Sequence, residues 1–497
     1  MTLKKNILAN YLGQGWSVLM SLAFVPTYIN HIGIEAYALI GLFAVMQTWL
    51  SLLDMGMTPA LSREMARFTA GAHTPQSIRD LLRSLEVITF TFAVLIGLVL
   101  WWGSNWLGSH WLRVGSLSLN VVQESLVISA LVISLRLCEN LYRSTLIGLQ
   151  QQVWYNMANV ILSTLRHGGA VLVLAYVSPT IQVFFIWQGV MSLLVLVVYV
   201  TKLYSLLPQA DHRSHFSSGA VKGIWRFAGG AVGINLLGVL LTQVDKVLLT
   251  HLLTLEHYGY YTLAALVASG LYLMVGPITQ GIYPRLVELH TRDSTKDLAD
   301  VYHLGSQLVT VIIAPPAMLL FFNSEGFVFA WSGNPDLASH TATILTPLVL
   351  GSFLHCLILM PYNCQLASGW TSLTLKTNLF AVLILVPAIF LLVPKYGAIG
   401  AAWIWVVFNI GYLIIPAHIM YRYILSKEKW NWYRADIFVP TLGVVLMVII
   451  LQVFKPENGA SRLEWVAFLV LCVSLAYMTA AMLAGQVRRR LWAMVSG

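Results

Sequence analysis

The chain has 497 residues, of which 58% are hydrophobic and only 10% are charged, and its mean hydropathy is +0.76. Soluble domains carry roughly 25% charged residues, so this composition excludes a soluble protein and indicates an integral membrane protein. The formal net charge is +9. Lys and Arg collect in the cytoplasmic loops of membrane proteins, and no basic, aromatic-interleaved soluble module is present, so we expect no nucleic-acid partner.

Fourteen windows are long and apolar enough to cross a bilayer, because a spanning helix needs about 20 mostly apolar residues. In chain order they lie at 7–30, 34–53, 84–102, 120–142, 157–177, 181–204, 224–250, 258–280, 303–322, 341–365, 375–393, 398–424, 435–453 and 464–486. We therefore predict an all-α membrane protein with 14 transmembrane helices.

The basic residues orient these windows. With the N-terminus in the cytoplasm, 22 of the 29 Lys and Arg residues fall in inner segments or at the inner ends of windows, 4 fall in outer segments and 3 lie deep within windows. This asymmetry follows the positive-inside rule, so both termini are predicted to be cytoplasmic. The longest outer connections, 103–119 and 323–340, are short, so no large soluble domain is expected on that face.

A short motif occurs twice. Glu35-x-Tyr37 lies at the start of the second window, and Glu256-x-Tyr258 lies at the start of the eighth. Six windows separate the copies, so both halves enter the membrane in the same sense, as in a parallel repeat about an axis along the membrane normal. Two such lobes with a cleft between them favour transport by alternating access.

The repeat predicts four parts of the chain. They are an N-lobe of spans 1–6 (1–207), a cytoplasmic linker (208–222), a C-lobe of spans 7–12 (223–425), and spans 13–14 with a basic cytoplasmic tail (426–497). The Pro, Ser and charged residues of PQADHRSHFSS are typical of such a linker.

The sequence carries no motif for covalent chemistry. It lacks a GxxxxGK[ST] loop for ATP, and it lacks HExxH and a GxSxG with plausible triad partners. The histidines are scattered and form no metal-binding pattern. We therefore expect no enzyme, no catalytic residue, no metal and no cofactor.

Charges inside the apolar windows are the strongest functional signal, because each is costly in hydrocarbon and such groups usually face an interior cavity. Arg136, Glu139 and Arg143 are spaced three and four residues apart, so they share one helix face. Two interpretations stay open: an internal Arg136–Glu139 salt bridge that fixes packing, or a set of ligand-binding cations.

Arg166 has no acid three or four residues away, which makes it the best single candidate for binding a ligand. Asp245 and Lys246 are adjacent and therefore point about 100° apart on a helix, so one is expected to face the cleft and the other a neighbouring helix. Embedded cations outnumber deep acids. A cationic cleft suits an anionic substrate, and arginine matches phosphate in particular because its planar fork donates paired hydrogen bonds.

Three segments resemble the bacterial Wzx-type polysaccharide and O-antigen flippases of the multidrug/oligosaccharidyl-lipid/polysaccharide exporter superfamily. They are LLDMGMTPALSREMARF (Leu52–Phe68), QVDKVLLTHLLTLEHYGYYTLA (Gln243–Ala264) and KYGAIGAAWIW (Lys395–Trp405). The resemblance implies two six-helix bundles, plus two C-terminal helices, that open alternately to either side of the bacterial inner membrane.

The resemblance also implies a substrate. It would be an undecaprenyl-pyrophosphate-linked oligosaccharide, moved from the cytoplasmic to the periplasmic leaflet, with membrane lipids, a polysaccharide polymerase and a chain-length regulator as further partners. Two groups of residues follow from it. Substrate binding falls on Arg136, Arg143, Arg166 and Lys246, and coupling or gating falls on Asp54, Arg63, Glu139, Asp245 and Arg285. Proton or sodium coupling would use Asp245 or Glu139.

One departure from the family and two alternatives remain. Lipid II flippases place arginines in their early spans, whereas the first two windows here offer the amides of Asn10, Gln14 and Gln47, which argues against a peptidoglycan precursor. A drug/cation antiporter of the same superfamily would need more acids in its lobes. A membrane glycosyl-polymerase or ligase would need a large outer loop.

Overall fold

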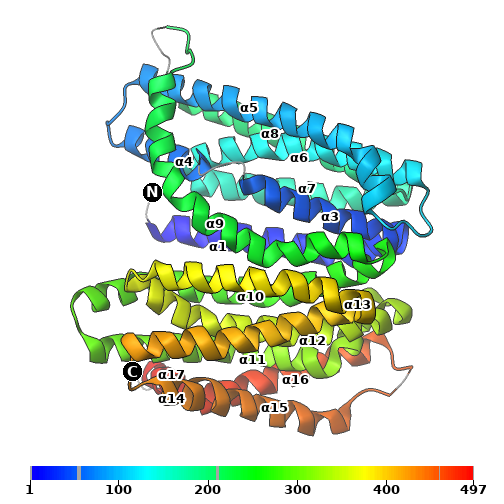
Figure 1. Cartoon of the computed structure of the whole chain (residues 1–497), viewed down its shortest axis with the longest axis vertical. Coiled ribbons are helices and arrows are strands. Elements are labelled where there is room, and N and C mark those ends of the chain that lie inside the picture. The colour runs from blue at the N-terminus through cyan, green and yellow to red at the C-terminus, as the bar shows by residue number, and fades with distance from the viewer. Residues whose placement is uncertain (1–2, 53–56, 209–211, 458, 496–497) are drawn as a thin grey trace. The chain divides into compact units, whose positions relative to one another are not determined.

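The computed structural model describes residues 3–52, 57–208, 212–457 and 459–495. Over these residues the regular structure is helical, apart from one isolated bridge between Arg113 and Thr254 (Figure 1). The predicted all-α class is therefore confirmed. The elements in chain order are α1 (Leu3–Ala23), α2 (Val25–Ile32), α3 (Ile34–Ser51), α4 (Met57–Thr69), α5 (Pro75–Trp106), η2 (Leu107–Trp111), α6 (Leu119–Gly148), α7 (Gln152–Tyr176), α8 (Ile181–Leu206), α9 (Ser218–Leu252), α10 (Leu255–Thr291), α11 (Thr295–Ser332), α12 (Pro335–Ala367), α13 (Thr371–Tyr423), α14 (Lys429–Asn431), η3 (Trp432–Phe438), α15 (Val439–Leu451), η4 (Gln452–Phe454), α16 (Arg462–Leu483) and α17 (Gly485–Val495).

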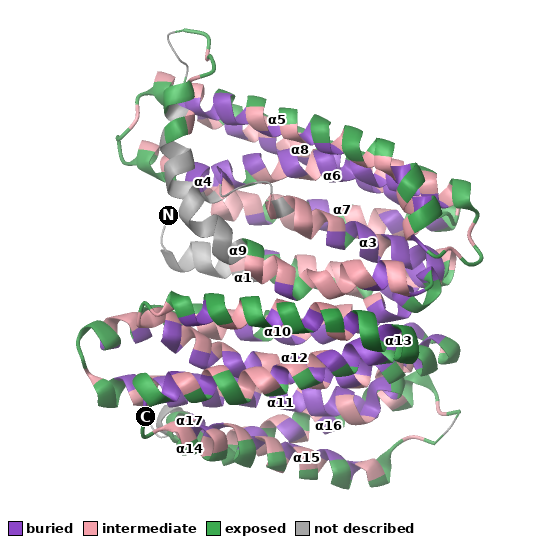
Figure 2. Ribbon diagram, in the orientation of Figure 1, coloured by how far each residue is buried: buried purple, intermediate pink, exposed green. Residues whose placement is uncertain are grey.

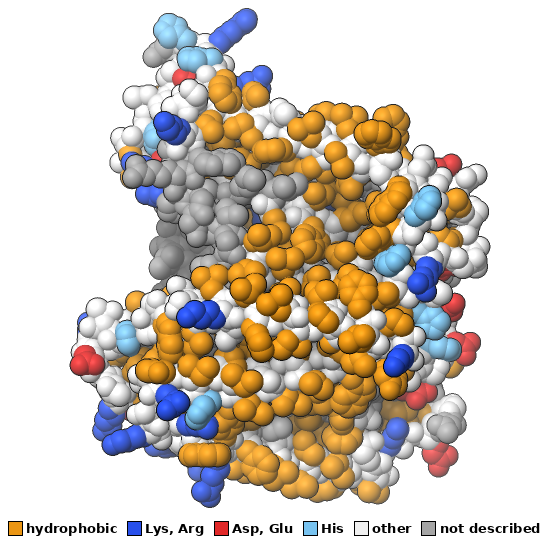
Figure 3. All heavy atoms as spheres, viewed as in Figure 1, with side chains coloured by type: hydrophobic (Ala, Val, Ile, Leu, Met, Phe, Trp, Pro, Cys, Tyr) orange, Lys and Arg blue, Asp and Glu red, His pale blue; other side chains and the backbone are white. Residues whose placement is uncertain are grey.

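Within the described residues, ten helical segments are long and apolar enough to cross a membrane, and Ile34–Leu50 is a shorter apolar helix. Figure 3 shows hydrophobic side chains over the middle of the helices and charged side chains near helix ends. The protein is therefore a multi-pass membrane protein. The total of fourteen spans stays a prediction, because the windows at 7–30 and 224–250 fall on helices whose side chains are described only in part.

α13 contains two of the predicted windows. With 53 residues at 1.5 Å per residue it would be about 80 Å long if it were straight, far more than a bilayer core of about 30 Å. Gly397 has φ 62° and ψ −149°, a conformation that favours glycine. It therefore separates two helical parts, and the break lies between windows 375–393 and 398–424.

The chain packs as two compact units, Met1–Gly259 and Tyr260–Gly497. In the first unit, α6 packs against α5 and α8, α7 packs against α1 and α8, and α9 lies beside α3, α4 and α5. By its packing contacts, α9 therefore belongs to the first unit. The predicted lobes, which begin the second half at residue 223, are defined by the repeat and stay a prediction.

α11 and α12 form the core of the second unit. Of the most apolar 18-residue window, 78% is buried in α11 and 67% in α12, against 28% or less in α10, α13, α15 and α16 (Figure 2). α12 and α16 both pack against α11, and α13 packs against α12. The less buried helices therefore present the apolar faces that a bilayer would cover.

Outside the predicted spans, Glu64 joins α4 to the loop that precedes α5. Its carboxylate accepts hydrogen bonds from His73 at 2.8 Å and from Arg67 at 3.0 Å. Burial alone would raise the pKa of Glu64, but the hydrogen bonds and charges of His73 and Arg67 outweigh it and lower the pKa. The carboxylate therefore stays ionised and holds this basic hairpin together.

Both copies of the repeated motif begin a helix, but their acids have different environments. Glu256 is exposed in the first turn of α10. Glu35 is 7% exposed in the first turn of α3, and its carboxylate accepts hydrogen bonds from the backbone N–H groups of Gly115 at 2.6 Å, Ser116 at 2.8 Å and Leu117 at 3.2 Å. Glu35 therefore anchors the segment between η2 and α6.

We expect Glu35→Ala to lower the stability of the protein by on the order of 3 kcal/mol, because several donors to a charged acceptor lose their partner. Glu256→Ala is the matched control and should cost less than about 1 kcal/mol, the size of a helix-terminus charge effect. The apparent Tm of the detergent-purified variants measures both. Equal shifts for the two variants would contradict the anchoring role of Glu35.

Candidate functional site

A polar cavity of about 220 Å³ lies inside the first unit, between α1, α3, α6, α7 and α8. Its polar lining comes mainly from α6 and α7. The described polar side chains that line it are Ser17, Gln47, Arg136, Glu139, Asn140, Arg143, Tyr155, Asn159, Ser163, Arg166, His167 and Tyr199.

The face of α6 predicted from residue spacing is the one turned to this cavity, since Arg136, Glu139 and Arg143 all line it. Arg136 lies 17 residues after the first residue of α6 and 12 before the last. Arg166 lies 14 residues after the first residue of α7 and 10 before the last. Both guanidiniums therefore sit near the middle of helices long enough to span, where an ionised group is expensive and points to function.

Arg166 pairs with an acid from the neighbouring helix. Its Nη2 lies 3.2 and 3.3 Å from the carboxylate oxygens of Glu139, and the two side chains are 16% and 12% exposed. Arg166 has no acid three or four residues away on its own helix, but the neighbouring helix supplies one. Helix periodicity reports neighbours along one helix only, whereas this pair bridges α7 and α6.

Arg136 has neutral partners. It donates to the side-chain oxygens of Gln47 at 2.7 Å and Gln188 at 2.9 Å, and its guanidinium lies 4.8 Å from the ring centroid of Phe43. The Arg136–Glu139 salt bridge considered from the sequence is therefore absent, since Glu139 binds Arg166. Amides and an aromatic ring orient Arg136 while leaving its charge uncompensated by a direct carboxylate contact.

Arg143 supplies a third cation to the cavity. Its side chain is exposed, and among the described residues it makes no hydrogen bond or ion pair. Three guanidiniums thus face one carboxylate, so the lining carries a net positive charge. Such a lining can bind a phosphate or carboxylate group through charge-assisted hydrogen bonds.

Amides along α1 and α7 close another side of the cavity. Asn156 donates to Asn10 at 2.6 Å, and Asn159 donates to Ser17 at 2.7 Å. These contacts explain why the first window carries polar residues without a cation. These polar contacts between neighbouring helices hold the cavity-lining face of α7 against α1.

The other predicted site residues lie elsewhere. Lys246, on α9, donates at 3.2 Å to the Gln243 side chain, and Asp245 is half-buried; neither lines this cavity. Arg285 forms an exposed ion pair with Glu288 at 2.6 Å on α10, and Arg63 is exposed on α4. Asp54 lies outside the described residues. The functional roles of these residues stay predictions.

Sequence reasoning missed Gln188, Tyr155 and Asn159. Gln188 is 3% exposed on α8 and accepts from Arg136, and a lone glutamine in an apolar run was a usable signal because a buried amide requires a partner. Tyr155 and Asn159 recur at helical spacing on the face of α7 that carries Arg166. Among the described residues no group of His, Cys, Asp and Glu is placed to hold a metal ion.

Solved structures of membrane transporters share this helical fold. A lipid II flippase, MurJ, in an inward closed conformation superposes with a TM-score of 0.70 at 13% identity, covering 96% of this chain and 98% of that one. An inward-facing multidrug resistance MATE family transporter superposes with a TM-score of 0.65 at 14% identity, covering 83% of this chain and 96% of that one. At these identities the likeness establishes the fold alone.

The sequence itself identifies the family. The family described as "Polysaccharide biosynthesis protein" matches residues 3–290. A protein of Shigella flexneri named "Putative O-antigen transporter" is 20% identical over 409 residues, which is 82% of this chain and 94% of that protein. The chain belongs to the polysaccharide biosynthesis protein family, and the predicted family resemblance is confirmed.

Proposed function

We propose that the protein is a flippase for an undecaprenyl-pyrophosphate-linked oligosaccharide, which it moves from the cytoplasmic to the periplasmic leaflet of the bacterial inner membrane. The observation that carries the proposal is the cavity in which Arg136, Arg143 and Arg166 face the single carboxylate of Glu139. Membership of the polysaccharide biosynthesis family and the likeness to an O-antigen transporter support a glycan-bearing lipid as the cargo.

The size of the cavity indicates which part of the substrate it would take. About 220 Å³ holds a phosphate-sized group and not a whole lipid-linked oligosaccharide. The lipid tail would stay in the bilayer while the charged headgroup passes through the protein. The cytoplasm is electrically negative, so the potential drives an anion outward by about 2.3 kcal/mol per charge per 100 mV.

Transport of this kind needs no covalent step, so no catalytic residue is proposed. Coupling to protons or sodium would add a second driving force, with Asp245 or Glu139 as the titrating group. A drug/cation antiporter shares the fold, but a cavity with three arginines repels cationic drugs. A polysaccharide polymerase and a chain-length regulator would act on the glycan after this protein has exported it.

The test is reconstitution of the full chain into proteoliposomes that contain a fluorescent undecaprenyl-pyrophosphate oligosaccharide in one leaflet. We expect the protein to raise the rate at which the label reaches the opposite leaflet, measured by a membrane-impermeant quencher. Protein-free vesicles are the control. A rate equal to that of protein-free vesicles, with protein that remains folded, would reject the proposal.

A further inference from the structure

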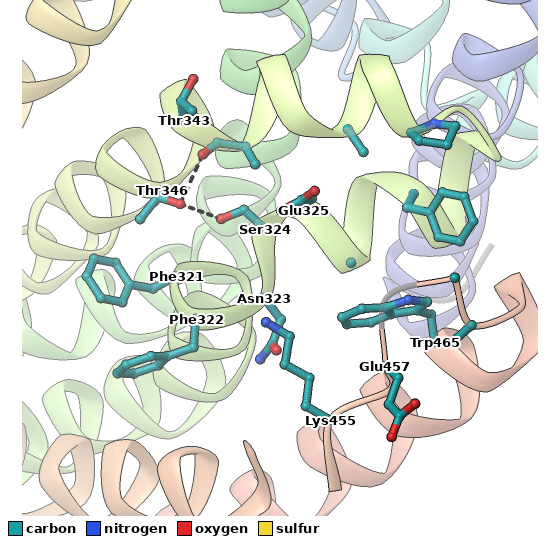
Figure 4. A pocket seen from close by; sticks show the side chains of 17 residues that line it. Phe321, Phe322, Asn323, Ser324, Glu325, Thr343, Thr346, Lys455, Glu457 and Trp465 are labelled. Carbon is teal, nitrogen blue, oxygen red and sulfur yellow. Dashed lines mark hydrogen bonds between the residues drawn. The ribbon is translucent and has the colours of Figure 1, made fainter. Parts of the chain in front are cut away.

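A second pocket, of about 480 Å³, lies in the second unit where the end of α11 and the start of α12 meet α16 and the segment after η4 (Figure 4). Its volume falls within the range of about 300–1,000 Å³ that is typical of small-molecule sites. None of the residues predicted from the sequence to be functional lines it. This pocket is therefore distinct from the predicted functional residues.

Asn323 is the most unusual residue of this pocket. Its backbone is non-helical, with φ −134° and ψ 32°, so it interrupts α11 nine residues before that helix ends. Its side chain is buried, with 2% exposure, and among the described residues neither its amide oxygen nor its amide nitrogen has a hydrogen-bond partner. Leaving such a group unsatisfied costs about 1–3 kcal/mol, so its place in the wall of a pocket calls for a partner that would satisfy it.

The amide also defines the chemistry of its partner. It carries two N–H donors and one carbonyl acceptor, so its best partner offers both an acceptor and a donor. Hydroxyl groups and acetamido groups do so. The hydroxyls of Ser324 and Thr346 hydrogen-bond to each other at 2.6 Å and also contact backbone carbonyls of their own helices. Their protons are therefore in use, and they add acceptor capacity on the same wall.

An aromatic wall completes the site. Trp465 of α16 packs against Gly326 of α11, where any Cβ would collide with the indole ring, so glycine is required for this close approach. Figure 4 shows the Trp465 ring as part of the pocket wall, with Phe321 and Phe322 farther along α11. Aromatic faces provide large apolar contact area in binding sites, and they suit the C–H face of a sugar ring.

The charges at the rim argue against an anionic ligand. Glu325 and Glu457 are two exposed carboxylates against one exposed ammonium, that of Lys455, which lies 5.9 Å from the ring centroid of Trp465. A phosphate would be repelled by this rim. Carboxylates accept hydrogen bonds from sugar hydroxyls, and a neutral ligand rich in hydroxyls fits all of these groups.

We propose that this pocket binds a single sugar unit of the transported glycan. The choice of glycan rests on the proposed function. The orientation predicted from the basic residues places 323–340 and Lys455 outside the membrane, on the face to which the oligosaccharide would be delivered. The pocket would hold the glycan after the headgroup crosses, whereas the arginine cavity would hold the phosphate.

The experiment is saturation-transfer NMR on the purified full chain in detergent, with N-acetylglucosamine, glucose and rhamnose as separate probes. We expect at least one sugar to bind the wild-type protein. Asn323→Ala and Trp465→Leu should each weaken binding at least fivefold. Glu325→Ala, at an exposed position that carries little folding risk, should also weaken it.

The matched controls are Asn30→Ala and Trp102→Leu, which remove an exposed amide and an exposed indole outside the pocket. Both should bind sugar like the wild type. The proposal is wrong if the wild-type protein binds none of the probes. It is also wrong if Asn323→Ala and Glu325→Ala bind as well as the controls, because the amide would then be satisfied by water alone.

This experiment separates the two proposals. Sugar binding is measured without any transport, and flipping in proteoliposomes is measured without free sugar. Flipping without sugar binding would overturn only the proposal that this pocket binds a sugar. Sugar binding that is lost in the pocket variants, with no flipping by the wild-type protein, would overturn the proposed transport and leave the pocket as a glycan site.

Discussion

Arg166→Ala is expected to reduce export of surface polysaccharide at least tenfold. The guanidinium would bind the phosphate of the substrate, and a charge-assisted hydrogen bond contributes about 1.5–3 kcal/mol. The single substitution also leaves Glu139 unpaired, and breaking a buried ion pair by removing one partner costs about 3–5 kcal/mol of stability. A loss of export by Arg166→Ala alone could therefore reflect either binding or folding.

The double variant Arg166→Gln with Glu139→Gln separates the two effects, because it removes both charges and keeps side chains of similar size. We expect normal protein levels and thermal stability, yet export still reduced at least tenfold. Neutralising Lys296 and Asp300, two exposed charges four residues apart on α11, is the matched control and should export normally. Wild-type export by the Arg166/Glu139 double variant would restrict Arg166 to a packing role.

The second large effect is expected at Asp436, which is 1% exposed and accepts from His303 at 2.5 Å and from Gln307 at 2.8 Å. This carboxylate joins η3 to the central helix α11. Asp436→Ala should therefore lower the stability of the protein by about 3–5 kcal/mol, because it leaves buried polar groups without a partner. The apparent Tm in detergent measures the loss.

Two variants test that interpretation. Asp300→Ala removes an exposed carboxylate near the start of α11 and should leave the apparent Tm within a degree or so of the wild type, as for most surface substitutions. Replacing His303 and Asp436 together by leucine should recover part of the stability, because apolar replacement of a buried pair is often neutral, while Gln307 still lacks its acceptor. If Asp436→Ala had the same apparent Tm as the wild-type protein, the His303–Asp436 contact would not hold η3 to α11.

The sequence predicted the fold class because the bilayer imposes a length and an apolarity on every span. It also placed the break in α13 correctly, since Pro394 and Gly397 separate two apolar windows. The sequence predicted that 323–340 connects two spans on the outer side. In the structure most of this segment is helical, because α11 continues past the Asn323 kink to Ser332 and α12 begins at Pro335. Hydropathy falls at the end of the bilayer core, whereas hydrogen-bonded helices can continue into water.

The site was predicted in part. The spacing of Arg136, Glu139 and Arg143 was enough to bring them to one face. The choice of partner was not predictable, because Arg166–Glu139 and Arg136–Gln188 are contacts between helices whose relative rotation is set by packing. The pocket at Asn323 could not be found in this way, since its signal is a buried amide without a partner, and burial is visible only in three dimensions.

The ion pair of Arg166 with Glu139 has a consequence for turnover. Under the proposed function, an anionic cargo would compete with the Glu139 carboxylate for Arg166, and Glu139 would pair with Arg166 again when the cargo leaves. Glu139 would then act as an internal competitor that lowers the affinity for the cargo and speeds its release. A transporter must release the substrate that it binds. A cluster of arginines without a competing carboxylate would bind an anion too tightly to release it quickly.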